Sequence, residues 1–234
     1  IGAIWFDGWW DHKEDPNFDW QLPEQYALIH GLQPACLVGN NHHVTPFDGE
    51  DMQIFERDLP GENTAGLSGQ DISRLPLETC ETMNGMWGYK ITDQNYKNKK
   101  TLVQYLVRAA GKNANLLMNI GPDGSGQLPE QAVAVMDKVG DWFARNGASV
   151  YGTSAGGVAD GKDVVSTRKG KTLYLHFLNP EKKTFTFKPA RGIASARHLA
   201  SGQPVAFEKD ATGAVTLTIA RAANDAFDFV VEVK

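Results

Sequence analysis

A change in residue pattern near position 150 divides this 234-residue sequence into two parts. Before it, short apolar runs alternate with stretches of helical spacing, which is typical of parallel βα units. After it, short segments alternate between apolar and polar side chains and are separated by glycine-containing turns, which is typical of antiparallel strands. We therefore predict an α/β region over residues 1–150 and an all-β region over residues 151–234.

The first region has the pattern of four strands and three helices. The predicted strands are 1–6, 36–39, 75–79 and 115–120. The predicted helices are 23–31, 97–110 and 129–147. Pro23 and Pro129 suit first helical turns, and Gly111 suits the residue that ends a helix. Between about 40 and 75 we expect a long irregular segment, and a loop of that length is usually functional.

The number of strands limits the architecture of each region. A closed (β/α)₈ barrel needs eight strands and about 250 residues. With about four strands, the first region is either a small open sheet or the back half of a barrel. The second region has six or seven short strands, which predicts an antiparallel sandwich. The six clearest are 164–167, 172–178, 184–188, 193–198, 215–219 and 227–233.

Composition narrows the choice of partners. The chain carries 23 basic and 28 acidic side chains with no basic block, which argues against a nucleic-acid partner. No apolar run approaches the roughly 18 residues of a membrane span. Cys36 and Cys80 do not form a CxxC pair, so zinc and redox motifs are unsupported. His42 and His43 lack a third ligand at a telling spacing, and we expect neither a metal nor a cofactor.

Asp7 is the first candidate for chemistry. It directly follows an apolar strand, and catalytic groups in parallel βα architectures project from the carboxyl ends of strands. Trp5, Trp9 and Trp10 flank it, and aromatic rings pack well against the C–H faces of sugars. This surrounding suggests carbohydrate chemistry. The alternative is that Asp7 only caps the turn before Gly8.

Glycoside hydrolysis needs a second carboxyl group, and the long segment supplies several. Its candidates are Glu50, Asp51, Glu56, Asp58 and Glu62. One of them could lie opposite Asp7, and at least four must be solvated surface charges. The run 40–43, Asn-Asn-His-His, follows the second strand and offers hydrogen-bond partners for sugar hydroxyls. Trp87 follows the third strand and either packs in the core or stacks on a substrate.

Three motifs taken together are more specific than any one of them. They are Ile4-Trp5-Phe6-Asp7-Gly8, Glu78-Thr79-Cys80 with Asn84 and Trp87-Gly88-Tyr89, and Asn115-Leu116-Leu117-Met118-Asn119-Ile120-Gly121-Pro122. Over about residues 1–153 this set resembles α-L-fucosidases of glycoside hydrolase family 29. The resemblance implies a retaining exo-hydrolase that releases α-L-fucose from fucosylated glycans by double displacement. The last segment is similar to that family's C-terminal β-sandwich in position and pattern.

The resemblance also implies catalytic roles. The aspartate of the W-x-D-G motif is the family nucleophile, and here it is Asp7. The acid/base varies more in position, because the intervening loop varies in length. Matching the stretch after the Asn/His-bearing strand places it at Glu56, with Asp58 and Glu62 as rivals.

Three further residues match substrate-binding positions of the family. Trp5 matches one wall of the fucose pocket, and Trp87 matches an aromatic residue that borders the fucose methyl group. His42, or one of its neighbours, falls near a polar sugar-binding position that is often arginine in relatives. The expected partner is a fucosylated oligosaccharide or glycoconjugate.

The resemblance implies a (β/α)₈-like barrel, and the strand count predicts only its C-terminal half in residues 1–150. We therefore expect the N-terminal half to be a missing segment or a separate chain, and this chain to be inactive alone. One rival function is a carbohydrate-binding module or an inactive fucosidase-like fragment. Another is a hydrolase for a related sugar such as galactose.

Overall fold

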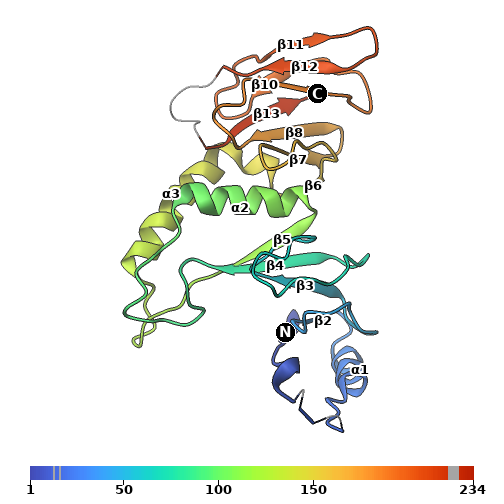
Figure 1. Ribbon diagram of the computed structural model, residues 1–234, viewed down its shortest axis with the longest axis vertical. Coiled ribbons are helices and arrows are strands. Elements are labelled where there is room, and N and C mark those ends of the chain that lie inside the picture. Colours follow the sequence, from blue (N-terminus) through green and yellow to red (C-terminus); the bar gives the residue numbers. More distant parts are fainter. Residues whose placement is uncertain (13, 16, 221–226) are drawn as a thin grey trace. The chain divides into compact units, whose positions relative to one another are not determined.

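The computed structural model describes residues 1–234 except 13, 16 and 221–226 (Figure 1). The chain forms two compact units, one of residues 1–82 with 113–119 and one of residues 83–112 with 120–234. The predicted fold class is confirmed, because a parallel half-barrel sheet is followed by antiparallel sheets of a sandwich. The domain boundary near residue 150 stays a prediction.

The first unit is built on a parallel sheet whose strands follow one another in chain order. They are β1 (Ala3–Phe6), β2 (Leu37–Asn40), β3 (Met52–Glu56), β4 (Leu77–Thr82) and β5 (Ala114–Asn119). The register pairs Phe6 of β1 with Asn40 of β2, and Glu56 of β3 with Cys80 of β4. Parallel strands in chain order are the arrangement of a barrel wall, and their carboxyl ends share one edge.

Strand β3 corrects the expectation that residues 40–75 are irregular throughout, and it raises the number of parallel strands to five. Strands of parallel sheets are buried on both faces, so they lack the alternation that reveals other strands. Gln53 in β3 also interrupts the apolar run, although its side chain is only 1% exposed. Its amide donates to the Asp71 carbonyl at 2.8 Å and accepts from the Ser73 N–H at 2.7 Å. These bonds hold the following connection against the strand.

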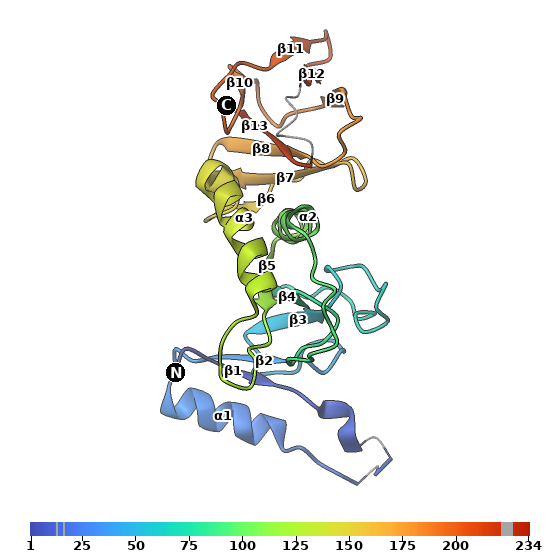
Figure 2. The same ribbon diagram turned by 90° about the vertical axis from the view of Figure 1, so that its left-hand side faces the viewer.

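Helix α1 (Leu22–Leu32) connects β1 to β2 and lies alongside both strands (Figure 2). Pro23 stands in its first turn, as predicted. Leu22 and Tyr26 of the helix form a small core with Val38 of β2. The Tyr26 ring also meets Phe6 of β1 edge-on, with ring centroids 5.2 Å apart. The core thus ties the helix to the strand that precedes Asp7.

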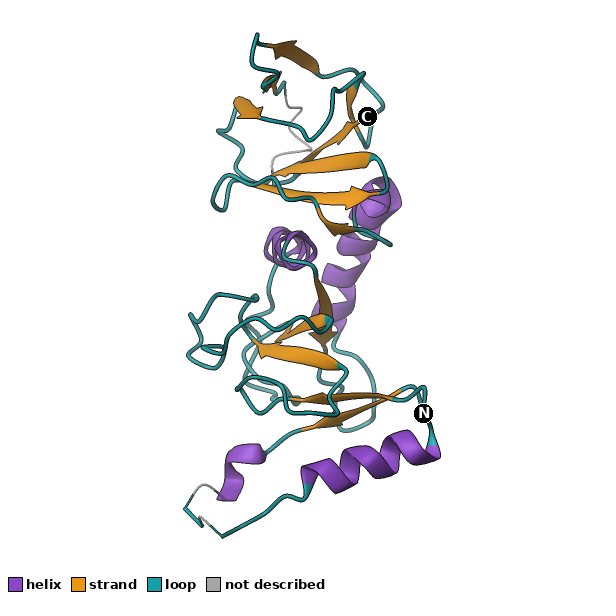
Figure 3. Cartoon of the chain, turned by 90° about the vertical axis from the view of Figure 1, so that its right-hand side faces the viewer, coloured by secondary structure: helices purple, strands orange, loops and turns teal. Residues whose placement is uncertain are grey.

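The second unit contains two α-helices, one short 3₁₀ helix and two antiparallel sheets (Figure 3). Its helices are α2 (Lys99–Gly111), α3 (Glu130–Asn146) and the short η2 (Gly147–Ser149). One sheet has the order β10-β13-β8-β7-β6, with β6 (Ser154–Ala155), β7 (Val164–Lys169), β8 (Thr172–Phe177), β10 (Ala196–His198) and β13 (Phe229–Val233). The other has the order β11-β12-β9, with β9 (Thr184–Phe187), β11 (Ala206–Lys209) and β12 (Val215–Thr218).

The two antiparallel sheets share one apolar core. Leu175 and Val231 from the larger sheet and Leu217 from the smaller one are fully buried in it. Strands β6 and β11 have no counterpart in our prediction, because β6 has only two residues and β11 buries none of its side chains. Among the described residues, no helix has the length and apolar character needed to cross a membrane.

Candidate active site

The candidate site is assembled at the carboxyl edge of the parallel sheet. Asp7 directly follows β1, and Glu56 is the last residue of β3. Strand β2 lies between these two strands in the sheet. Side chains that directly follow β2 are therefore placed near both carboxyl groups: Asn41 bonds both of them, and His43 bonds Glu56.

Asn41 bridges the two carboxylates with one amide nitrogen. Its Nδ2 atom lies 3.4 Å from Oδ1 of Asp7 and 2.7 Å from Oε2 of Glu56. By geometry these two oxygens are therefore no more than about 6.1 Å apart. The backbone N–H of Gly8 also donates to Oδ1 of Asp7, at 3.0 Å.

His43 is the second side chain that holds Glu56. Its Nε2 atom lies 3.0 Å from Oε2, and the two side chains are 19% and 12% exposed. The imidazole stacks on the indole of Trp10, with ring centroids 4.8 Å apart and planes 14° from parallel. Trp10 belongs to η1 (Trp9–His12), the short helix that follows Asp7. The same histidine therefore contacts structure from both strand ends.

In Asp7 and in Glu56, one carboxylate oxygen accepts hydrogen bonds and the other has no donor among the described residues. Oδ1 of Asp7 and Oε2 of Glu56 accept all the hydrogen bonds described above. Within the part of the chain that the structure describes, no donor bonds Oδ2 of Asp7 or Oε1 of Glu56. Asp7 is exposed. The open oxygens are therefore available to a substrate.

A buried hydrogen-bond network fixes the segment between β2 and β3. The Nδ1 atom of His42 accepts the N–H of Val44 at 3.2 Å, so Nε2 carries the proton and donates to Glu50 Oε1 at 2.9 Å. Tyr26 donates to the same oxygen at 3.0 Å, and Asn40 donates to the Tyr26 hydroxyl at 2.8 Å. Burial raises the pKa of Tyr26 well above its usual value, so the phenol stays a donor.

His42 itself is only 4% exposed. Its neighbours Asn41 and His43 make the contacts with the carboxylates. The sugar-binding role predicted for His42, or for a neighbour, stays a prediction. The run 40–43 and the aromatic residues around Asp7 indicated the correct segments. Sequence reasoning did not single out Asn41, His43 or Trp10 within them, because the sequence does not show which side chains turn inward.

The two rival acids lie in the connection between β3 and β4. Asp58 is 2% exposed and accepts the N–H groups of Thr64 at 2.9 Å and Ala65 at 2.8 Å, besides the Thr64 hydroxyl. Both of its oxygens are thus engaged in shaping the loop. The backbone N–H of Glu62 bonds the Leu59 carbonyl at 2.8 Å. Of the three candidate acids, Glu56 is the one whose carboxylate shares a hydrogen-bond donor with Asp7.

Cys80 lies beside Glu56 in the sheet and is 4% exposed. Burial raises the pKa of its thiol from 9.0 to about 12, and the charge of Glu56 adds to the shift. The thiol therefore stays neutral and unreactive at physiological pH. Among the described residues, no cluster of His, Cys, Asp and Glu could hold a metal ion.

The two tryptophans predicted to line the sugar pocket belong to different units. Trp5 lies in β1 and is half-buried. Trp87 is also half-buried and lies in the segment 83–112 of the second unit. Their pocket-lining roles stay predictions.

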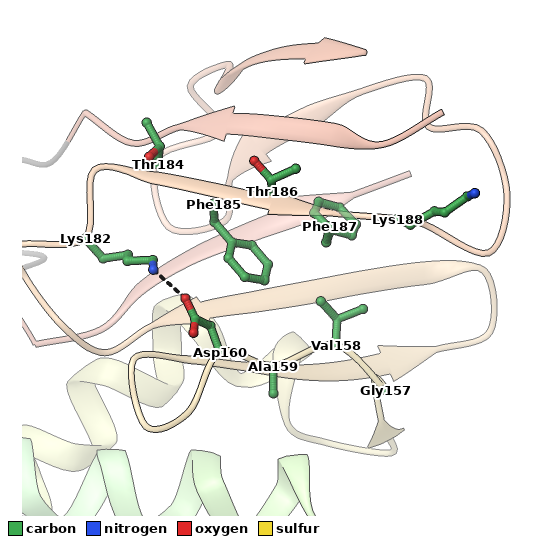
Figure 4. Close-up of a pocket in the computed structure, with 10 residues that line it drawn as sticks. All are labelled: Gly157, Val158, Ala159, Asp160, Lys182, Thr184, Phe185, Thr186, Phe187 and Lys188. Carbon is green, nitrogen blue, oxygen red and sulfur yellow. Dashed lines mark hydrogen bonds and ion pairs between the residues drawn. The ribbon is translucent and has the colours of Figure 1, made fainter. Parts of the chain in front are cut away.

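A separate pocket of about 660 Å³ lies in the sandwich (Figure 4). The segment Gly157–Asp160 lines one side and the stretch Thr184–Lys188 lines the other. Lys182 forms an ion pair with Asp160 across it. Its lining offers one carboxylate, and that group is already paired, so the pocket lacks the two carboxyl groups of a glycosidase.

Comparison with known proteins assigns the chain to a family. The sequence model for alpha-L-fucosidase matches residues 2–148. The chain belongs to the alpha-L-fucosidase family. The resemblance drawn from the three motifs is thereby confirmed.

Individual family members show how much of an alpha-L-fucosidase this chain represents. It is 29% identical to alpha-L-fucosidase isoenzyme 1 from Paenibacillus thiaminolyticus, with a TM-score of 0.80 over 100% of this chain and 57% of that one. It is 30% identical to the human plasma alpha-L-fucosidase over 55% of this chain and 30% of that protein. The Dictyostelium discoideum alpha-L-fucosidase is 33% identical over 33% of this chain and 17% of its own length. The chain therefore spans well under two thirds of these relatives.

A Bacteroides thetaiotaomicron alpha-L-fucosidase, solved as a trapped covalent intermediate, has the same fold. Its TM-score is 0.79 at 20% identity, over 100% of this chain and 56% of that one.

Proposed function

We propose that this chain supplies the nucleophile and the acid/base of a retaining α-L-fucosidase acting on fucosylated glycans. The observation that carries the proposal is the single amide nitrogen of Asn41 bonded to both Asp7 and Glu56. It keeps their bonded oxygens within about 6.1 Å. Retaining glycosidases separate their carboxyl groups by about 5–5.5 Å and inverting ones by about 6.5–9.5 Å, and the bound on the bonded oxygens is compatible with the retaining arrangement.

In the first step, the open Oδ2 oxygen of Asp7 attacks C1 of fucose and forms a covalent ester. The bond between C1 and the leaving oxygen breaks, and Glu56 gives its proton to that oxygen. In the second step, Glu56 takes a proton from water while the water oxygen attacks C1. The ester bond to Asp7 breaks, fucose leaves, and both carboxyl groups return to their starting states.

Three aromatic or polar residues complete the proposal on the substrate side. As the family resemblance implies, we propose that Trp5 is one wall for the sugar, that Trp87 borders its methyl group, and that His42 or one of its neighbours binds its polar side. A galactoside carries a hydroxymethyl group where fucose carries the methyl. Aryl α-L-fucoside should therefore be cleaved much faster than the matching galactoside, and equal rates would favour the galactosidase alternative.

Replacing the nucleophile tests the chemistry directly. In the full natural protein, Asp7→Asn should lower kcat by at least about a thousandfold, because the amide cannot form the ester. Fucose binding, measured by calorimetry, should persist. Asp141→Asn, an exposed position of α3, is the matched control and should keep full activity. Fucose binding without turnover in the unmutated protein would favour a binding module instead.

We also propose that this chain alone does not turn over substrate. Strands β1 and β5 each pair with one neighbour in the described sheet, so both outer edges are open. Barrel closure removes such edges and completes the pocket wall. The isolated chain should therefore show no hydrolysis of aryl fucoside, and measurable turnover would refute this part of the proposal.

A further inference from the structure

Glu56 receives both of its hydrogen bonds on one oxygen. Asn41 Nδ2 lies 2.7 Å from Oε2 and His43 Nε2 lies 3.0 Å from the same atom. An amide nitrogen is always a donor, so Oε2 acts as an acceptor toward Asn41. Oε1 has no donor among the described residues. The two oxygens of this carboxyl group are therefore chemically different before any substrate arrives.

Whether Nε2 of His43 donates or accepts the hydrogen bond decides which oxygen of Glu56 carries the acid proton. If Nε2 donates, Oε2 accepts two hydrogen bonds and the proton must reside on Oε1. If Nε2 instead accepts, the proton lies on Oε2 and points at the imidazole, away from any leaving group. The first arrangement serves an acid, because the open oxygen is the one that a glycosidic oxygen can approach.

The backbone and the stacking partner hold His43 in place. Its φ angle is 63°, a left-handed conformation that few residues other than glycine adopt, with asparagine, aspartate and histidine the most frequent among them. The indole of Trp10 stacks on the imidazole of His43, with ring centroids 4.8 Å apart, and restricts the rotation of that ring. Backbone strain of this kind persists where the surroundings enforce it and is concentrated at functional sites.

We propose that His43 is the positioning residue of Glu56: its Nε2–H holds Oε2 as an acceptor and so places the transferable proton on Oε1. This inference rests on the proposed function. Trp10 keeps the imidazole in the plane that makes the bond. Because Trp10 follows Asp7 in the chain, the stack also ties the acid to the strand end that carries the nucleophile.

The test uses the full natural protein and two substituted forms of it. His43→Asn suits the left-handed backbone, but its amide is too short to reach Oε2. His43→Gln is longer, and its amide hydrogen can replace Nε2–H. For each form kcat/KM is measured on two α-L-fucosides, one with an acidic dinitrophenol leaving group and one with an alcohol leaving group. The value of kcat/KM reports the first chemical step. In that step the two leaving groups differ in their need for a proton.

We expect His43→Asn to lower kcat/KM on the alcohol substrate by about tenfold to a hundredfold, because acid catalysis contributes about 10²–10⁴. On the dinitrophenol substrate the change should stay within about threefold. His43→Gln should recover most of the loss on the alcohol substrate. Thermal unfolding of both variants shows whether the fold is kept.

Three outcomes would overturn the inference. Equal loss on both substrates would make His43 merely structural. Unchanged rates in a folded His43→Asn protein would show that the hydrogen bond from His43 to Glu56 does not contribute to catalysis. Failure of a folded His43→Gln protein to recover would remove the donor role. An unmutated protein without fucosidase activity, or an active Asp7→Asn protein, would instead defeat the proposed function and the inference with it.

Discussion

At the scale of single residues, the candidate site depends on an amide that belongs to neither predicted catalytic position. Asn41 is 4% exposed, and its Nδ2 atom is the donor shared by Asp7 and Glu56. The amide donates to one oxygen of each carboxyl group and so stabilises two acidic side chains at close range. A carboxylate at position 41 would have the opposite effect.

Asn41→Asp removes the shared donor and adds a negative charge beside the two carboxyl groups without changing the shape of the side chain. We expect the free energy of unfolding at pH 7 to fall by about 1–3 kcal/mol. The loss should shrink as the pH approaches 4, because the introduced aspartate begins to take up a proton. Urea unfolding at both pH values measures this, with the exposed Asn95→Asp as control. An equal loss at both pH values would contradict the charge argument.

Cys80 predicts a pH dependence with a definite sign. Burial raises the pKa of the folded thiol from 9.0 to about 12. Between these values the unfolded chain releases a proton that the folded chain keeps, so stability falls as the pH rises above 9 and is unaffected below it. The contribution is up to about 1.4 kcal/mol per pH unit. The free energy of unfolding is measured for the unmutated chain and for Cys80→Ala at pH 7, 9 and 10.5. It should fall less steeply with pH in the variant, and equal slopes would contradict a raised pKa of the Cys80 thiol.

At the scale of elements, helix α2 and strand β7 meet at a glycine. We predicted Gly111 as the residue that ends the helix, and the structure includes it in α2 as the last residue. A Cβ atom there would lie 2.1 Å from Cγ1 of Val165. The glycine is therefore needed because the helix and the sheet approach closely, and not because the chain turns into a left-handed conformation.

Gly111→Ala should lower stability although alanine is the better helix former. Overpacking costs about 1–3 kcal/mol, which exceeds the gain of about 1 kcal/mol in helix propensity. Val165→Ala in the same chain should recover part of the loss by removing the clashing methyl groups. Thermal unfolding of the two single variants and the double variant measures how far the two substitutions depend on each other. Strictly additive changes in stability would contradict a close contact between positions 111 and 165.

At the scale of the whole molecule, the two compact units do not follow the order of the chain. The segment 113–119, strand β5 with its preceding residue, belongs to the first unit, whereas α2 before it and α3 after it belong to the second. Gln104 of α2 donates to the carbonyls of Leu178 at 2.9 Å and Phe227 at 2.7 Å. The sandwich is therefore stabilised by a helix that lies before residue 150.

A fragment of residues 151–234 tests the predicted domain boundary. It lacks α2 and α3, so the two carbonyls lose their donor and the face of β7 that contacts α2 is exposed. We expect the fragment to keep β-type circular dichroism but to unfold several degrees lower than the sandwich in the intact chain, because two hydrogen bonds from α2, each contributing about 0.5–1.5 kcal/mol, are lost. An unchanged unfolding temperature would mean that the helices add nothing to the sandwich.

The sequence by itself determined the features that depend on neighbouring residues along the chain. The strand before Asp7, helix α1 with Pro23 and the change of pattern near 150 are of this kind, because hydrophobic period and helix-end preferences act locally. The resemblance also indicated Asp7 and Glu56 as a pair. Only the tertiary structure decided that β3 exists around the buried Gln53, and that Asn41 and His43 contact Glu56. Those outcomes depend on which strands are neighbours, and contacts between distant segments leave no periodic trace in the sequence.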